Sequence, residues 1–249
     1  MPLSRPGDNR RKEPMRTNDL DPRSQPAYTL REAALCVRVP PATLRAWTVG
    51  RPYPTTSERR HSAPLIAPAD GDRGLFSFVN LIEAQVLRAL RTVHELSLQN
   101  VRKALREYGR HDPKDHPLAF EDFQTDGLDL FVERYGQTIN LSRSGQIALR
   151  SALAEHLRRV DRDGLGPIRL FPFVHSDDDR RQVVSVSPRV AFGRPVIDGT
   201  RVGTDDVVAR IRRGDPPEAV AEDLHLTEQQ VVDACVFEEW GRRGSSKAA

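Results

Sequence analysis

Thr43 and Arg45 are the residues of this sequence whose types and spacing best suit contacts with nucleic acid. A short hydroxyl and a guanidinium donate hydrogen bonds to phosphate oxygens, and the guanidinium also fits the acceptor edge of guanine. Leu44 and Trp47, three residues apart, are expected to form the inner face of a helix, which leaves the other two pointing outward. Arg38, in the turn before this helix, is grouped with them as a DNA-contacting residue.

Two short helices in the segment Tyr28–Trp47 must hold these side chains in place. Thr29 and Glu32 form a capping box, in which each side chain accepts a hydrogen bond from an otherwise unpaired backbone N–H. Pro41 suits the first position of the second helix. The segment therefore predicts a helix-turn-helix whose second helix enters a DNA groove. Two ordinary core helices are the alternative interpretation.

The residues from Thr48 to Phe78 are expected to form a wing beside the helices. Two apolar pieces, Pro64–Ile66 and Leu75–Phe76, are expected to pair as short strands around the turn Ala69–Asp72. Basic side chains on such a hairpin reach the phosphate backbone. The candidate contacts are Arg51, Arg59, Arg60 and Arg73.

Two further helices are expected, over Val79–Leu96 and from Ser97 to Gly109. With them, the segment Tyr28–Gly109 resembles the winged-helix regulators of the MerR type. The wing is longer than is usual in that family, and no long coiled-coil helix or cysteine-bearing effector domain follows. The resemblance therefore implies DNA binding, but not metal or drug sensing.

The second strong motif is Pro195–Val202, with the sequence PVIDGTRV, followed by three expected short helices. The first is expected to be capped by Thr204, and the last by Thr227 with Gln230. The stretch from about Val184 to Glu239 resembles a bacterial domain-of-unknown-function family with the signature P-V-I-x-G-T-R-V. Its members are commonly encoded beside PIN-like ribonuclease toxins, and the whole chain resembles the VapB-type antitoxins of actinobacteria.

This resemblance implies two partners, double-stranded operator DNA and a PIN-like ribonuclease toxin. Such a nuclease has an acidic metal centre, into which an arginine such as Arg194 or Arg201 would fit as an inhibitory device. The structural alternative is that Gly199 permits a tight turn and Arg201 ties strand ends together. Both interpretations of these arginines remain open at this point.

Catalysis is not expected, because no G-x-S-x-G, H-E-x-x-H or kinase-like motif occurs. Glu238 and Glu239 are adjacent on a helix and point in different directions, which makes a poor acid–base pair. A breaker-rich linker carries four side chains able to bind metal, but a solvated loop with two prolines is a poorly organised site. These are His111, Asp112, Asp115 and His116. We therefore expect no metal and no cofactor.

The composition of the 249 residues fits a cytoplasmic protein of about two domains. Hydrophobic residues make up 38% and charged residues 29%, which allows modest cores and a well-solvated surface. The net charge is only +3, so clustering of arginine matters more than the total. Two cysteines are too few for a disulfide framework, and we expect buried thiols in a reducing compartment. No secretory signal and no membrane contact are expected.

The predicted fold is mainly α with small β elements (α+β), comprising an N-terminal winged helix-turn-helix and a C-terminal three-helix, helix-turn-helix-like module. In the middle region we expect short strands at Ala119–Phe123, Leu128–Glu133 and Thr138–Leu141, a helix over Gly145–Val160, and strands at Ile168–Val174 and Gln182–Val186. The expected divisions are a disordered tail (1–26), the DNA-binding domain (27–109), a linker (110–118), the middle region (119–183), the C-terminal module (184–240) and a second tail (241–249).

The expected function is that of an antitoxin in a type II toxin–antitoxin pair. As a homodimer it would bind operator DNA, repress its own operon and neutralise the toxin. A stand-alone MerR-like transcriptional regulator without a toxin is the alternative. A third possibility reverses the modules, with the C-terminal helices on DNA and the N-terminal ones as scaffold.

Overall fold

The structure is a computed structural model that describes residues 21–50, 52–54, 59–61, 64–93, 97, 99–103, 116–120, 132–133, 136–137, 141–175 and 181–246. Most of the expected N-terminal tail and Arg51 lie outside these residues. Within them, no helix has both the length and the apolar character needed to cross a membrane.

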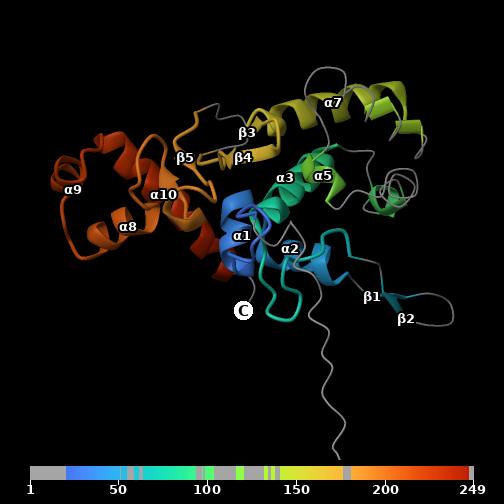
Figure 1. The fold of residues 1–249 in the computed structure, drawn as a ribbon, viewed down its shortest axis with the longest axis horizontal. Coiled ribbons are helices and arrows are strands. Elements are labelled where there is room, and N and C mark those ends of the chain that lie inside the picture. Colours follow the sequence, from blue (N-terminus) through green and yellow to red (C-terminus); the bar gives the residue numbers. More distant parts are fainter. Residues whose placement is uncertain are drawn as a thin grey trace, which may run out of the picture.

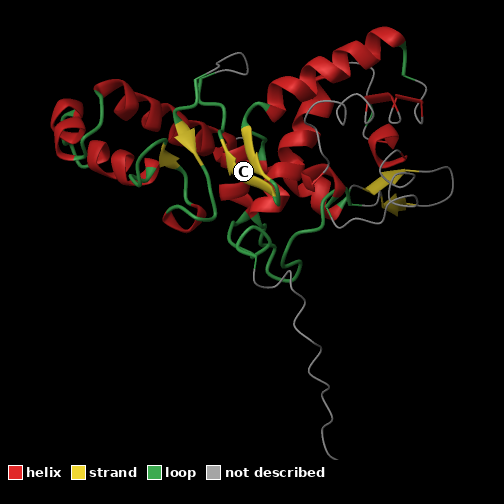
Figure 2. Cartoon of the chain, turned by 45° about the horizontal axis from the view of Figure 1, so that its top comes forward, coloured by secondary structure: helices red, strands yellow, loops and turns green. Residues whose placement is uncertain are grey.

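The described chain is mostly helical, with small two-stranded antiparallel sheets (Figures 1 and 2). Its helices are α1 (Leu30–Val37), α2 (Pro41–Val49), α3 (Phe78–Thr92), α5 (Pro117–Phe120), α7 (Arg143–Leu157), the 3₁₀ turn η2 (Ala191–Gly193), α8 (Thr204–Arg212), α9 (Pro217–Asp223) and α10 (Glu228–Ser246). Its strands are β1 (Pro52–Pro54), β2 (Arg59–His61), β3 (Val160–Asp163), β4 (Gly166–Leu170), β5 (Val184–Ser185) and β6 (Val196–Ile197). This agrees with the coarse prediction of an α+β fold.

The start of the N-terminal helix-turn-helix follows the predicted local pattern. The Thr29 and Glu32 side chains each accept a hydrogen bond from the other residue's backbone N–H, which confirms the capping box. Pro41 is the first residue of α2. Leu44 and Trp47 are buried, as expected for the inner face of this helix.

The wing differs from the predicted pairing. The ladder forms between β1 and β2, and the backbone N–H groups of Leu65 and Ile66 instead donate to the carbonyl of Trp47 near the end of α2. Carbonyls at a helix end lack partners within the helix, so this segment satisfies one of them. Phe76 pairs with Tyr28 rather than with Pro64–Ile66, and only the short Asp70–Leu75 bridge remains of the expected hairpin.

The three strands expected before α7 are wrong where the structure describes them, whereas the strands expected at Ile168–Val174 and Gln182–Val186 are confirmed in part by β4 and β5. α5 begins at Pro117 and places Leu118 and Ala119 in the core beneath α3, and residues 132–133 and 136–137 are also helical. Burial against α3 prevailed over the local sequence that suggested strands. The expected helix over Gly145–Val160 appears as α7.

One hydrophobic core joins the N-terminal helices to the middle region. It contains residues of α1, α2 and α3 together with Leu149 and Leu153 of α7 and Leu170 of β4. Strand β3, which the sequence analysis did not predict, pairs with β4 at the edge of this core. On α7, Leu149 and Leu153 are buried, whereas Ile147 is 63% exposed.

The C-terminal helices α8, α9 and α10 surround a second core that includes Val207 and Val220. Gly203, not Thr204, occupies the position before α8, and the Thr204 hydroxyl donates to Glu238 on α10 at 2.6 Å (Oγ1–Oε1). The expected Thr227–Gln230 capping box is confirmed by reciprocal hydrogen bonds. α10 reaches Ser246, beyond residue 240, where the C-terminal module was expected to end.

α10 returns to the N-terminal helices and packs on α1 (Figure 1). Gly241 faces Leu35 so closely that a β-carbon there would lie 3.1 Å from a methyl group of Leu35. Phe237 forms a small cluster with Val174 and Val184, against which Leu35 also packs. The end of the C-terminal module thus packs against the helix-turn-helix.

Candidate nucleic-acid interface

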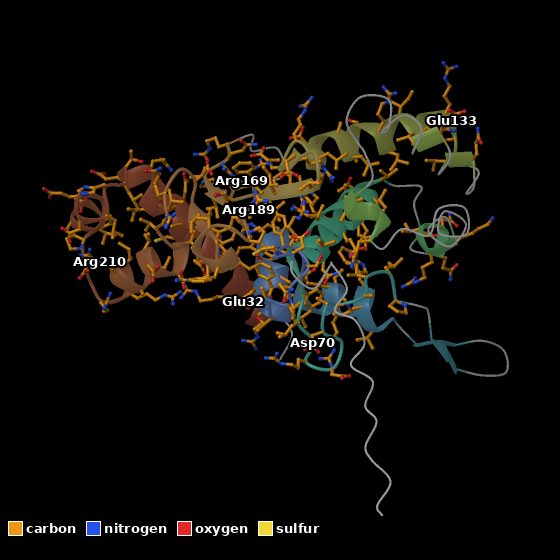
Figure 3. The ribbon with its side chains drawn as sticks, in the orientation of Figure 1. Glu32, Asp70, Glu133, Arg169, Arg189 and Arg210 are labelled. Atoms are coloured by element: carbon orange, nitrogen blue, oxygen red, sulfur yellow. The ribbon has the colours of Figure 1, made fainter. Side chains whose placement is uncertain are left out.

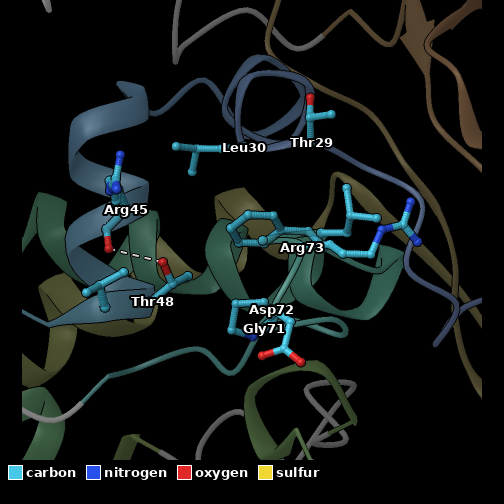
Figure 4. A pocket seen from close by; sticks show the side chains of 12 residues that line it. Thr29, Leu30, Arg45, Thr48, Gly71, Asp72 and Arg73 are labelled. Atoms are coloured by element: carbon cyan, nitrogen blue, oxygen red, sulfur yellow. Dashed lines mark hydrogen bonds between the residues drawn. The ribbon is translucent and has the colours of Figure 1, made fainter.

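A cleft of about 500 Å³ lies beside α2 and is the candidate interface (Figure 4). α2 contributes Arg45, Thr48 and Val49 to its lining, and the start of α1 contributes Thr29 and Leu30. The opposite wall is the turn made by residues 71–76. The cleft therefore lies between the predicted recognition helix and the part of the predicted wing that the structure retains.

Arg45 and Arg73 are brought to this one cleft from opposite walls (Figure 4). Arg45 is exposed on α2, and Arg73 is exposed on the turn, where its Nη1 lies 3.9 Å from Asp70 Oδ2. Such an exposed ion pair contributes little energy, so the Arg73 guanidinium can exchange it for a phosphate. Asp72 also lines the cleft and reduces its positive charge.

Thr43 is less favourably placed than predicted. Its side chain is half-buried and is not part of the cleft lining, whereas Arg45 two residues later is exposed and lines the cleft. Its backbone N–H belongs to the first turn of α2, where it donates to the carbonyl of Pro40. A role for Thr43 in base recognition remains a prediction.

Two residues of the cleft, Thr48 and Val49, were missed by the sequence analysis. They follow Arg45 by three and four positions and so share its face of α2. The Thr48 hydroxyl donates to the Arg45 carbonyl at 3.0 Å (Oγ1–O), and Val49 is one of the few large apolar side chains that remain exposed. Helical spacing from Arg45 was the signal that could have found them. Methyl groups on such a face suit contact with the methyl group of thymine.

Arg38 does not belong to this interface, which corrects its assignment as a DNA contact. Its side chain is 9% exposed, and its guanidinium donates to the backbone carbonyls of Phe173 and Val174. The guanidinium also lies over the rings of Phe237 and Trp240, at 5.6 and 5.1 Å from the ring centres. Arg38 thus fastens the turn of the helix-turn-helix to α10 and to the segment after β4.

The backbone of this turn is held from other directions as well. Arg38 ends α1 in the left-handed conformation, with a φ of 54°, and its N–H closes the last turn of the helix. Arg88 of α3 donates to the carbonyl of Val37 at 3.3 Å (Nη1–O) and lies 4.5 Å from the ring centre of Phe173. The turn that orients α2 therefore depends on contacts from α3 and from residues beyond 170.

The remaining predicted DNA contacts lie on or near the hairpin β1–β2. Arg59 and Arg60 are in β2, where they pair with Pro54 and Tyr53 of β1, but their side chains lie outside the described residues, as does Arg51. Figure 1 shows the hairpin extending away from the helices. A role for these arginines as backbone contacts therefore stays a prediction.

The two arginines expected to contact a toxin have different surroundings. Arg194 bridges Asp205 and Asp206 at the start of α8, at 2.6 and 3.1 Å from their nearest carboxylate oxygens, and these hydrogen bonds raise its pKa above the usual value. Arg201 is exposed and forms no hydrogen bond or ion pair with any described residue. The turn after β6 is closed by Thr200 instead, whose hydroxyl donates to the Ile197 carbonyl.

The described residues contain no group of three or more His, Cys, Asp or Glu side chains able to hold a metal ion. Of the linker residues able to bind metal, only His116 is described, and its Nδ1 lies 3.0 Å from Glu83 Oε2 in α3. His111, Asp112 and Asp115 lie outside the described residues.

Comparisons with known proteins divide the chain into two matched segments. Residues 26–105, which contain the cleft, match the family described as "Putative DNA-binding HTH domain". Residues 184–237 match the family described as "Protein of unknown function (DUF433)". The first match is consistent with the helix-turn-helix of α1 and α2, and the second covers α8, α9 and most of α10.

Most of the chain is also similar to a curated protein and to a solved structure, both from Mycobacterium tuberculosis. It is 30% identical over 228 residues to "Putative antitoxin VapB45" of strain ATCC 25618 / H37Rv, covering 84% of this chain and 92% of the relative. The crystal structure of Rv2018 aligns with a TM-score of 0.58 at 27% identity, covering 85% of this chain and 97% of that chain. Because this relative is 30% identical and the match covers 92% of its length, the chain belongs to the family of "Putative antitoxin VapB45".

Proposed function

We propose that this protein is the antitoxin of a type II toxin–antitoxin pair. It binds operator DNA as a homodimer through the N-terminal helix-turn-helix, represses its own operon and neutralises a PIN-like ribonuclease. One observation carries the DNA-binding half: Arg45 and Arg73 line one cleft within the segment that matches a DNA-binding family. The antitoxin half rests on membership of the VapB45 family.

The geometry of the cleft supports contacts to both bases and phosphates. Arg45 projects from α2 beside Thr48 and Val49, which offers a guanidinium, a hydroxyl and methyl groups to the edges of base pairs. Arg73 stands on the facing turn, where a basic side chain can neutralise a phosphate. In a dimer, two such helices would read half-sites one helical turn or a multiple apart.

The C-terminal helices are less suited to hold DNA. α10 would be the recognition helix in that arrangement, yet it exposes Glu228 and Glu239, which repel phosphates. Its later turns are covered by α1, through Gly241 and Leu35. We therefore assign DNA to the N-terminal module and the toxin to the C-terminal one.

Binding to a DNA fragment from the promoter of its own operon, titrated with salt, tests the DNA-binding half. Arg45→Ala should weaken binding about 10- to 100-fold, corresponding to about 1–3 kcal/mol for one good base contact. Arg213→Ala is the matched control, because it removes the same charge from an exposed position in the C-terminal module. If Arg213→Ala weakens DNA binding as much as Arg45→Ala does, the C-terminal module binds DNA and the N-terminal module is the scaffold.

Co-expression with the product of the adjacent reading frame tests the antitoxin half. A stable complex that restores growth supports the proposal. DNA binding without a complex or toxicity would favour the stand-alone regulator. The resemblance to the MerR type stays a prediction in either case.

A further inference from the structure

Phe192 is the most exposed large hydrophobic side chain among the described residues, with 96% of its surface accessible. It lies in η2, within the segment that matches the family of unknown function rather than the one that matches a DNA-binding domain. A phenylalanine that contributes nothing to the core of its own chain gains by burial only when another molecule covers it. Exposed aromatic side chains of this kind are frequent anchors of protein interfaces.

The backbone that carries Phe192 is held in an unusual conformation. Ala191, Phe192 and Gly193 have φ values of 46°, 56° and 85°, so three consecutive residues are left-handed. Hydrogen bonds close the turn, from Gly193 N–H to the Val190 carbonyl at 2.9 Å (N–O) and from Arg194 N–H to the Ala191 carbonyl at 3.1 Å (N–O). A phenylalanine rarely adopts this conformation, and such strain is characteristic of functional positions.

Contacts on both sides fix the turn in place. Gly193 packs against the buried Tyr28, and a β-carbon at Gly193 would lie 2.4 Å from the Tyr28 hydroxyl oxygen. On the other side, Arg194 is tied to α8 by Asp205 and Asp206. The ring is therefore presented on a preorganised support, which lowers the entropy lost when a partner binds.

Two exposed arginines lie before and after the turn in the sequence. Arg189, three residues before Phe192, is exposed and lies near the junction of the N-terminal helices and the C-terminal module (Figure 3). Arg201, which follows β6, is exposed and has no ion pair with any described residue. Exposed guanidinium groups on the same segment as the ring would complement carboxylates at the edge of an apolar pocket on the toxin, the partner that the proposed function gives.

We propose that Phe192 is the anchor of the toxin interface and inserts into an apolar pocket of the toxin, with Arg189 and Arg201 facing carboxylates at the pocket's edge. This inference rests on the proposed antitoxin function and deepens it by naming the contact surface. It also changes the role expected for Arg194, which fixes the Phe192 turn to α8 instead of entering the toxin's metal centre.

The experiment measures the affinity of the full chain for the purified product of the adjacent reading frame, for wild type and three variants. Phe192→Ala removes the ring, and Phe192→Asn removes it while supplying a residue that adopts the left-handed conformation readily. Both should weaken the complex about 30-fold or more, as truncation of an interface anchor does. Ile147→Ala is the matched control, since it truncates another exposed apolar side chain on the distant α7.

Thermal unfolding and binding to the promoter fragment are measured on the same variants. Both are expected to be unchanged by Phe192→Asn, because the ring makes almost no contact within the chain. A complex of unchanged affinity in both Phe192 variants would overturn this inference while leaving the antitoxin function standing. Loss of DNA binding with an intact toxin complex would also overturn it and place the ring at the DNA. If the wild-type chain forms no complex, the proposed antitoxin function itself fails, and this inference fails with it.

Discussion

Arg38 and Arg45 are seven residues apart in the same helix-turn-helix, yet they lie on opposite sides of it. Arg38 points into the protein, where carbonyls of Phe173 and Val174 and the rings of Phe237 and Trp240 surround it. Arg45 points into an open cleft. Of these two arginines, Arg38 is an inner, structural residue, and Arg45 is an outer residue that is accessible to DNA.

The inner face also shows why the DNA-binding helices need the rest of the chain. The turn at Arg38 sets the angle between α1 and α2, and its side chain is held by groups that belong to the C-terminal half. A buried guanidinium is stable only when its donors are satisfied and its charge is compensated. We therefore expect damage to the inner face to affect folding, and damage to the outer face to affect binding alone.

Arg38→Ala should have the largest effect and tests the inner face. It leaves two buried carbonyls without their donor and removes the contact with two aromatic rings, which should lower the free energy of unfolding by about 2–4 kcal/mol. Urea denaturation measures this loss. Arg45→Ala serves as the control and should change stability by less than about 0.5 kcal/mol. Equal losses in the two variants would contradict the distinction.

Arg38→Lys separates charge from positioning in DNA binding. Lysine keeps the positive charge but lacks the planar fork that donates to two carbonyls and stacks on rings. If Arg38 acts by holding the turn, Arg38→Lys should weaken DNA binding by about 3- to 30-fold while leaving the salt dependence of the affinity unchanged. A lower salt dependence would instead indicate a direct phosphate contact.

Arg73→Ala should have a smaller effect on DNA binding, and it tests the role of the outer face. Loss of one phosphate contact should reduce the slope of log affinity against log salt by about one unit, with little change in sequence preference. Arg45→Ala should mainly relax sequence preference. Filter or fluorescence titrations at several salt concentrations distinguish the two results. If Arg73→Ala changed the sequence preference, the turn that carries Arg73 would contact bases rather than phosphates.

Glu238→Gln should have the smallest effect. Glu238 lies on α10, the helix that also carries the two aromatic residues in contact with Arg38. Burial raises the pKa of the Glu238 carboxyl, against the opposing hydrogen bond from Thr204. Because this pKa is raised in the folded protein, ionisation of Glu238 lowers stability as the pH rises above 4.5. The glutamine variant should therefore gain up to about 0.5 kcal/mol at pH 7, and this gain should disappear below about pH 4.5. Thermal unfolding at both pH values measures it; a gain that persists in acid would contradict the assignment.

Local sequence signals predicted the elements that depend on neighbouring residues. The capping boxes of Thr29 with Glu32 and of Thr227 with Gln230, and the start of α2 at Pro41, each rest on groups within four positions. The inward side chains of α2 followed from helical spacing. The exposed Arg45 followed from the same pattern.

The failures involve contacts between distant residues. The carbonyls that bind Arg38 are 135 and 136 residues away, so nothing near Arg38 indicates that it is buried. The short apolar stretch after Pro117 resembles a strand, but it is helical because α3 offers an apolar surface to Leu118 and Ala119. Pairing of Phe76 with Tyr28 likewise joins segments that no local rule connects.

The return of α10 to the helix-turn-helix also limits how such proteins can exchange parts during evolution. The segment matched as DNA-binding supplies Arg38, the segment of unknown function supplies Phe237, and Trp240 lies just beyond it. A recombinant protein that joins these segments from unrelated parents would bury the Arg38 guanidinium without its matching carbonyl and aromatic partners. Successful chimeras must inherit the arginine, the two rings and the carbonyls of Phe173 and Val174 as one unit.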